Sequence, residues 1–146
     1  MDLIEINDQI YLSAEFEDSD VSYIKSCGFD AVLDLRAEDT DNEQLIRKLG
    51  MDFFHVDIVD HENPTFKHLE DVLSFTDPIL DSGKKLLIHC RAGTGRAPLI
   101  AITILAHRGM KLPDAIDFVE SNHPNLGFSE VQIDFMKADL VRFFTS

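Results

Sequence analysis

The chain is poor in cysteine, in basic side chains and in long apolar runs. Two cysteines in 146 residues do not make a disulfide framework. No stretch reaches the roughly 18 consecutive apolar residues of a transmembrane helix. Lys and Arg number 13 against 27 Asp and Glu, which gives a formal net charge of −14. Because this field repels polyanions, we expect neither a nucleic-acid partner nor binding to an anionic membrane.

The ends of the chain carry no recognisable targeting signal. Residues 1–5 lack the basic start and apolar core of a signal peptide, and residues 143–146 hold no prenylation box. Together with the low cysteine count, these features predict a cytoplasmic protein without a membrane anchor.

The length and hydrophobic content are those of one globular domain spanning residues 1–146, since 45% of the residues are hydrophobic. Short apolar runs alternate with helical patterns, which predicts an α/β fold with a central, mostly parallel sheet flanked by helices. Residues 4–6 and 10–12 are expected to form a hairpin, and further strands are expected at 31–35, 53–56 and 85–88. The helix expected over 98–108 is apolar nearly all round and should be buried.

Several polar and special residues predict where the helices begin and end. Thr40 or Asp41 is expected to cap one helix and Thr65 the next, which Pro78 should kink or break. Pro98 suits the first position of the buried helix, and Gly109 suits the position just after its end. Two more helices are expected over 113–121 and 129–144.

The stretch from 89 to 98, which reads HCRAGTGRAP, lies between an apolar strand and the buried helix. A strand, a glycine-bearing loop and a helix N-terminus together form an anion cradle, because backbone N–H groups converge there and the helix dipole adds to the field. Gly93 and Gly95 let the backbone curl closely around an anion. The backbone amides of residues 91–96, namely Arg91, Ala92, Gly93, Thr94, Gly95 and Arg96, are the candidate phosphate-binding groups.

Cys90 and Arg96 stand at the two ends of this loop. A helix N-terminus and nearby cations lower a cysteine pKa from about 8.5 to roughly 3.5–7.5, which produces the nucleophilic thiolate. An arginine in the first turn of a helix opposes the dipole unless an anion offsets it. We therefore interpret Cys90 as a nucleophile and Arg96 as a two-pronged phosphate clamp, with His89 orienting the cysteine through hydrogen bonds.

This loop resembles the Cys-x5-Arg signature of the cysteine-dependent protein tyrosine phosphatases, and most of all their small dual-specificity branch. The resemblance covers nearly the whole chain: residues 54–60 are similar to the acid loop of the family, and 123–128 with Gln132 to its C-terminal segment. It implies hydrolysis of phosphotyrosine, with phosphoserine or phosphothreonine also open, in a phosphorylated protein or peptide, through a phosphocysteine intermediate. It implies no cofactor and no metal, and the histidines show no metal-ligand spacing.

The general acid should come from a separate loop, and two aspartates are candidates. Asp57 would lie at the end of a strand, where an aspartate often only anchors the turn, whereas Asp60 lies further into the loop. We favour Asp60, with Asp57 as the alternative. Arg36 and Glu38 could line the rim, although ordinary ion pairing is the simpler expectation for both.

Ala97 departs from the family pattern, which usually has Ser or Thr after the signature arginine. Here the loop resembles that of the phosphatases of regenerating liver, which implies slow breakdown of the phosphocysteine. Two alternatives therefore stay open beside a protein phosphatase. One is a phosphate-recognising binding module or near-inactive phosphatase, and the other a phosphatase of a soluble small molecule or a phosphoinositide.

Overall fold

Five strands form one sheet at the centre of the protein, whose structure, a computed structural model, describes residues 1–145. The strand order is β1-β2-β5-β3-β4. β1 pairs antiparallel with β2, whereas the β2–β5, β5–β3 and β3–β4 pairs are all parallel. The expected hairpin and the mostly parallel sheet are thus confirmed. The strands are β1 (Ile4–Glu5), β2 (Ile10–Ser13), β3 (Ala31–Arg36), β4 (Asp52–Ile58) and β5 (Leu86–His89).

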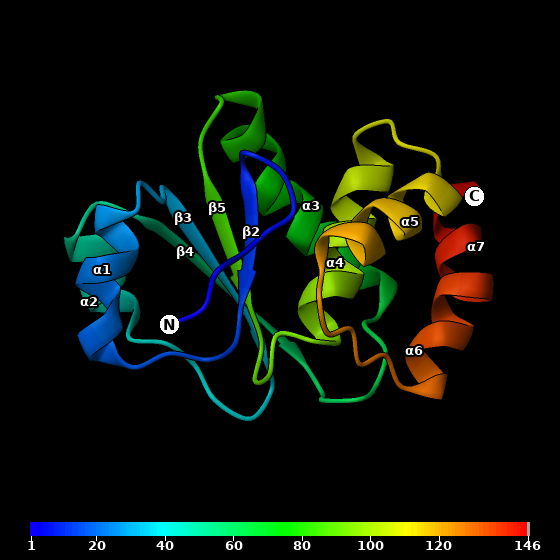
Figure 1. The fold of residues 1–146 in the computed structure, drawn as a ribbon, viewed down its shortest axis with the longest axis horizontal. Helices are drawn as coiled ribbons and strands as arrows, with labels where there is room; N and C mark the ends of the chain where they lie inside the picture. Colours follow the sequence, from blue (N-terminus) through cyan, green and yellow to red (C-terminus); the bar gives the residue numbers. More distant parts are fainter. Residues whose placement is uncertain (146) are drawn as a thin grey trace.

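Helices cover both faces of the sheet. α1 and α2 lie on one side, and α3 to α7 lie on the other (Figure 1). No helix among residues 1–145 combines the length and the apolar character needed to cross a bilayer. The helical segments are a short 3-10 turn η1 (Asp18–Asp20), α1 (Val21–Ser26), α2 (Glu43–Lys48), α3 (Phe66–Asp81), α4 (Arg96–His107), α5 (Leu112–Asn122), α6 (Glu130–Asp134), a π-helical turn η2 (Phe135–Asp139) and α7 (Leu140–Thr145).

The core consists of two apolar clusters, one on each face of the sheet. Successive side chains of a strand point to opposite faces, so along β3 Ala31, Leu33 and Leu35 join the larger cluster while Val32 joins the smaller one. All six residues of β3 and all four of β5 are buried. The expected burial of α4 is also confirmed, because Arg96 through Leu105 are all buried.

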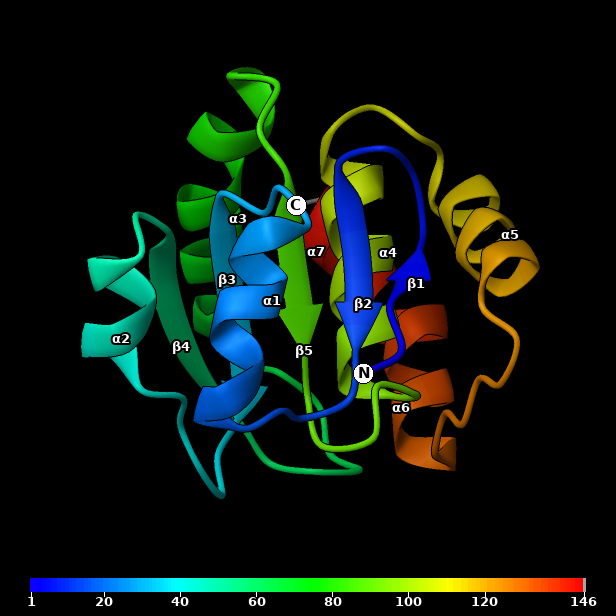
Figure 2. The ribbon, with the colours of Figure 1, turned by 60° about the vertical axis from the view of Figure 1, so that its left-hand side comes forward.

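The register of the parallel strands determines where the cradle lies. His89, the last residue of β5, pairs with Ser13 of β2 on one side and with Asp34 of β3 on the other. The C-terminal ends of these strands therefore meet at one edge, and the loop into α4 begins there (Figure 2). This is the edge at which open α/β sheets bind ligands.

Two helix starts differ from expectation. α2 is capped by Asn42, whose side chain accepts a hydrogen bond from the Leu45 amide, and not by Thr40 or Asp41. Asp41 is unavailable because its carboxylate is committed to Arg36 and His89. α4 starts at Arg96, so Pro98 is its third residue, not its first; the proline still lies in the first turn, where amides lack helical partners.

α3 and the C-terminal helical region also differ from expectation. Pro78 does not break α3, which continues to Asp81. Pro78 lies in the last turn of the helix. Ile79 and Leu80, which follow it, are buried in the core. The single helix expected over 129–144 is instead α6 and α7 joined by the π-helical turn η2. The Thr65 cap of α3 is confirmed, since Thr65 accepts a hydrogen bond from the His68 amide.

Candidate active site

The loop between β5 and α4 surrounds a cavity of about 280 Å³. Cys90 lies at its base, directly after β5, and is only 2% exposed. Gly95 is the N-cap of α4, so the N-terminus of this buried helix adjoins the cavity. The lining residues are Asp60, His61, Cys90, Arg91, Ala92, Thr94, Gly95 and Gly127.

Three contacts from two other segments, the residues after β2 and those between α5 and α6, hold the loop in its curled form. The Glu15 amide donates to the Arg91 carbonyl at 3.0 Å, and the Gly127 amide donates to the Thr94 carbonyl at 2.8 Å. His123 contributes a third contact, from its Nε2 to the Gly93 carbonyl at 2.8 Å. The loop carbonyls are thus bonded to the surrounding protein, an arrangement that suits a cradle whose N–H groups serve an anion.

Both cradle glycines lie close to neighbouring groups, and at Gly93 the neighbour is backbone. Gly93 has φ +75°, and a β-carbon there would lie 2.9 Å from the carbonyl carbon and oxygen of Ser13. At Gly95 a β-carbon would meet the side chain of Gln132 at 3.1 Å. Gln132 is itself buried, so the C-terminal segment packs directly against the loop.

The buried Arg96 guanidinium uses three of its N–H donors for contacts within the protein. Nη1 and Nη2 each donate to a carboxylate oxygen of Glu38 at 2.8 Å, and Nη1 also donates to the Ile58 carbonyl at 2.8 Å. Arginine has five such donors, so Nε–H and one Nη2–H remain. Buried Nε forms no hydrogen bond. These two donors lie on one edge of the guanidinium plane, and they can bind two oxygens of a phosphate.

The Arg96–Glu38 pair has a clear electrostatic signature. Burial works to lower the pKa of Arg96, but hydrogen bonding to Glu38 and the charges of Cys90 and Asp60 outweigh it and raise the pKa above its usual value. Hydrogen bonding from Arg96 in turn lowers the pKa of Glu38 to about 2. Both groups therefore stay ionised at neutral pH.

The two candidate general acids lie in different surroundings. Asp60 lines the cavity together with Cys90, and its Oδ1 lies 3.4 Å from Nε of Arg96. Asp57 is still part of β4 and contacts Nε2 of His68 at 3.1 Å, away from the cavity. Of the two candidates, only Asp60 therefore lies at the cavity with Cys90, while Asp57 contacts the first turn of α3.

A second contact holds the Asp60 loop over the cavity. The Ser129 hydroxyl, in the N-cap residue of α6, donates to the His61 carbonyl at 3.0 Å. His61 has φ +63°, an uncommon backbone conformation for a residue with a side chain. The loop that carries Asp60 is therefore held by the residue before α6, a contact that the sequence did not predict because Ser129 and His61 are far apart in the chain.

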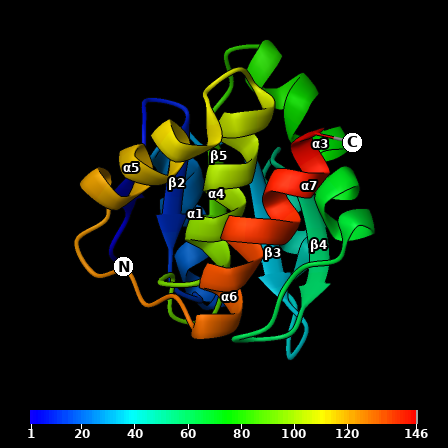
Figure 3. The same ribbon diagram turned by 90° about the vertical axis from the view of Figure 1, so that its right-hand side faces the viewer.

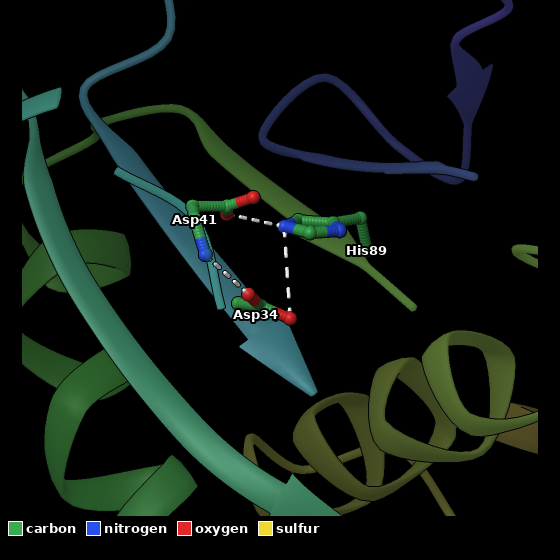
Figure 4. A group of neighbouring side chains, drawn as sticks. All are labelled: Asp34, Asp41 and His89. Carbon is green, nitrogen blue, oxygen red and sulfur yellow. Dashed lines mark hydrogen bonds and ion pairs between the residues drawn. The ribbon is translucent and has the colours of Figure 1, made fainter. Parts of the chain in front are cut away.

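His89 belongs to a buried charged cluster behind the cradle (Figure 4). Its Nε2 contacts Asp41, and Asp34 lies 3.9 Å away. Arg36 donates to both oxygens of Asp34 at 3.0 Å and to Asp41 at 3.1 Å. We expected His89 to orient Cys90 through a hydrogen bond. Within residues 1–145 no hydrogen bond joins the His89 ring to Cys90. His89, the residue before Cys90, instead contacts Asp41 and lies near Asp34 of β3, so it connects the start of the cradle to this strand.

Within residues 1–145, this cluster is the one group of side chains whose ligand atoms lie close enough together to hold a metal ion. One atom each of Asp34, Asp41 and His89 lie within 4.8 Å of one another. Arg36 already offsets the carboxylates, however, and occupies both oxygens of Asp34. The donor set is therefore compensated by a cation of the chain itself.

Glu38 is the functional residue whose role sequence reasoning missed. It and Arg36 do form ion pairs, as expected, but with different partners: Glu38 binds Arg96, and Arg36 binds Asp34, Asp41 and Glu15. Glu38 follows β3 at the same sheet edge as the cradle. This position is the one sequence feature from which its contact with Arg96 could have been predicted.

Comparison with known proteins identifies the class to which this fold and loop correspond. A family model described as the dual specificity phosphatase catalytic domain matches residues 10–138. Because this match covers most of the chain, the protein belongs to the dual specificity phosphatase catalytic-domain family.

Individual relatives agree with that assignment. The chain is 29% identical over 135 residues to dual specificity protein phosphatase 2 of Mus musculus, covering 86% of this chain but only 40% of the relative. It is 43% identical over 61 residues to protein tyrosine phosphatase type IVA 3 of Bos taurus, covering 38% of this chain and 34% of the relative. The chain thus spans less than half the length of these relatives.

A solved structure covers the whole fold. The active form of Tk-PTP superposes with a TM-score of 0.83 at 25% identity, covering 96% of this chain and 97% of that one. The expected family and fold are therefore confirmed.

Proposed function

We propose that the protein hydrolyses phosphate monoesters of phosphorylated proteins or peptides in two displacements at Cys90. In the first, the Cys90 thiolate forms a bond to phosphorus, the bond to the leaving oxygen breaks, and Asp60 gives that oxygen its proton. In the second, Asp60 takes a proton from water as the water attacks phosphorus and the S–P bond breaks. Inorganic phosphate and the free thiolate result.

The observation that carries this proposal is that Cys90 and Asp60 line one small cavity while Arg96 contacts Asp60 beside it. Cys90 and Asp60 both line it, and the unused Nε of Arg96 is buried 3.4 Å from Asp60. A phosphate there would receive two guanidinium donors and the amides of residues 91–96 as its equatorial charge develops. Asp60 on the separate loop would lie on the leaving-group side.

Aryl-phosphate turnover by the wild type, Cys90→Ser, Asp60→Asn and Asp57→Asn tests this assignment. We expect Cys90→Ser to abolish turnover and Asp60→Asn to lower kcat by about 10²–10⁴-fold, the range of general acid catalysis. Asp57→Asn is the matched control and should keep turnover close to that of the wild type. If Asp57→Asn instead shows the large loss, the acid assignment is reversed.

The second displacement, breakdown of the phosphocysteine, is slow in this proposal because residue 97 is alanine. The residue is fully buried in the first turn of α4, and its methyl group offers no hydroxyl to the phosphocysteine. Ala97→Ser should therefore raise the steady-state rate and reduce the burst of leaving group seen in stopped flow. Ala101→Ser is a matched control, since Ala101 is also fully buried on α4 but one turn further from the cradle. Equal effects of the two substitutions would mean that intermediate breakdown does not depend on position 97.

The second candidate is a phosphate-recognising module with little or no turnover, and Ala97 is the observation that favours it. Equal aryl-phosphate rates for the wild type and Cys90→Ser, with phosphopeptide binding retained, would establish that reading. The net charge of −14 favours neutral or basic peptides in either case. A phosphopeptide array, with phosphoinositides and nucleotides as further arms, identifies the substrate class.

A further inference from the structure

A second and larger cavity lies at the opposite end of α4 from the cradle. Its volume is about 790 Å³, compared with about 280 Å³ at the candidate active site. Its lining residues come from the end of α4, from α5, from η2 and from α7. Figure 3 shows α4 between α5 and α7. The volume falls within the range of about 300–1,000 Å³ typical of small-molecule sites.

The walls of this groove are apolar. They include two of the four methionines of the chain, and methionine is a flexible side chain that adapts to different apolar ligands. Val141 is 42% exposed there, although it is apolar. The main apolar lining residues are Met110, Leu112, Ile116, Met136, Val141 and Phe144.

The charged side chains of the groove all have the same sign. Lys111 and Lys137 line it, and no carboxylate does so among residues 1–145. Neither lysine forms an ion pair within that part of the chain. His107, also at the groove, is paired with Asp77. In a chain where acidic side chains outnumber basic ones by 27 to 13, an apolar groove with two unpaired lysines and no acid is a local exception.

The backbone is also irregular at this place. Met136 and Lys137 belong to η2, the π-helical turn between α6 and α7. Such turns are rare and are frequently found at functional sites. Here the turn places two consecutive residues, the apolar Met136 and the cationic Lys137, at the groove.

From this combination we infer that the groove binds a small amphipathic anion, of the chemical class of a fatty carboxylate. The apolar walls take up the hydrocarbon chain, and Lys111 and Lys137 pair with the carboxylate at the rim. The site is independent of phosphate chemistry, because none of its residues lines the cavity at Cys90.

Calorimetric titration of the Cys90→Ser protein with monomeric dodecanoate tests the inference without any contribution from turnover. We expect saturable binding of one dodecanoate per chain. Dodecyltrimethylammonium has the same hydrocarbon chain with a cationic head, and it should bind at least tenfold more weakly. Absence of saturable dodecanoate binding, or equal binding of the two amphiphiles, overturns the inference.

Matched variants locate the site. Val141→Glu places a carboxylate in the groove and should weaken dodecanoate binding at least tenfold. Val131→Glu is the control, because Val131 is similarly exposed at 48% but lies on α6 outside the groove. Lys111→Gln and Lys137→Gln should each weaken binding about threefold, the scale of one exposed ion pair, whereas Lys48→Gln on α2 should not.

Sedimentation distinguishes the remaining occupant, a second copy of the chain. A wild-type dimer that Val141→Glu converts to a monomer would show that another protomer fills the groove, and this result also overturns the inference. Equal losses for Val141→Glu and Val131→Glu would do the same. All of these outcomes leave the proposal for Cys90 untouched.

Discussion

Gly93 and Gly83 have nearly the same positive φ but different surroundings. Alanine substitutions at the two positions therefore separate the stability cost of a side chain at positive φ from the cost of a close contact. Gly93, in the cradle, has φ +75°, and Gly83, in the turn between α3 and β5, has φ +73°. A β-carbon at Gly93 would lie 2.9 Å from the carbonyl carbon and oxygen of Ser13, whereas one at Gly83 would meet nothing within 4 Å. The two positions therefore share nearly the same φ and differ in what a β-carbon would contact.

The magnitudes follow from these two terms. An alanine in the left-handed region costs roughly 1–2 kcal/mol. The stiffer unfolded chain returns about 0.4–1 kcal/mol of this. Gly83→Ala should therefore lower the free energy of unfolding by roughly 0–1.6 kcal/mol. Gly93→Ala carries the same terms plus the overpacking against the Ser13 backbone, about 1–3 kcal/mol more.

Urea unfolding of both variants measures the difference, and tungstate binding measures its effect on the cradle. The backbone of Ser13 cannot rotate away as a side chain could, so in Gly93→Ala the loop itself must shift. We expect this variant to lose most of its affinity for tungstate, used here as a phosphate mimic, while Gly83→Ala binds like the wild type. Equal losses of stability, or unchanged tungstate binding by Gly93→Ala, would refute the close-packing argument.

Three further perturbations have defined outcomes. The pKa of Glu38 is lowered from 4.5 to about 2, so its contribution to stability is complete above pH 4.5 and is lost as the pH falls toward 2; Glu38→Gln should flatten the fall in melting temperature over that range. Asp41→Asn, at a side chain 3% exposed, should cost about 1–3 kcal/mol in urea unfolding by removing one of the buried carboxylates bonded to Arg36 and His89. Asp39→Asn, at a side chain 67% exposed, should cost less than about 0.5 kcal/mol. Leu33→Ala, in the middle of fully buried β3, should cost about 2–5 kcal/mol.

The features that the sequence predicted well depend on residues close together in the chain. The cradle is one contiguous run between β5 and α4, so its position at the sheet edge follows from the order of strand, loop and helix. The parallel sheet follows in the same way from alternating strand and helix patterns. Thr65 and Gly109 were placed correctly because caps are decided within one turn of helix.

The start of α2 shows where such local reasoning fails. Thr40, Asp41 and Asn42 are all good capping residues, and the sequence alone ranks them nearly equally. The choice is made by tertiary contacts: Asp41 is drawn into the buried cluster by Arg36 and by His89, which lies 48 positions away. Asn42 is then the residue left to cap the helix.

The prediction that Arg96 binds an anion was based on an incomplete reason. Its position in the first turn of α4 opposes the helix dipole, which predicted an anion at the cradle. Glu38, 58 positions earlier in the chain, already supplies one negative charge through two hydrogen bonds at 2.8 Å. The dipole argument therefore does not by itself require phosphate. A more direct reason is the Nε–H of Arg96, which forms no hydrogen bond and lies 3.4 Å from Oδ1 of Asp60 beside the cavity. A phosphate oxygen bound in the cradle would accept a hydrogen bond from this donor, which the dipole argument does not supply.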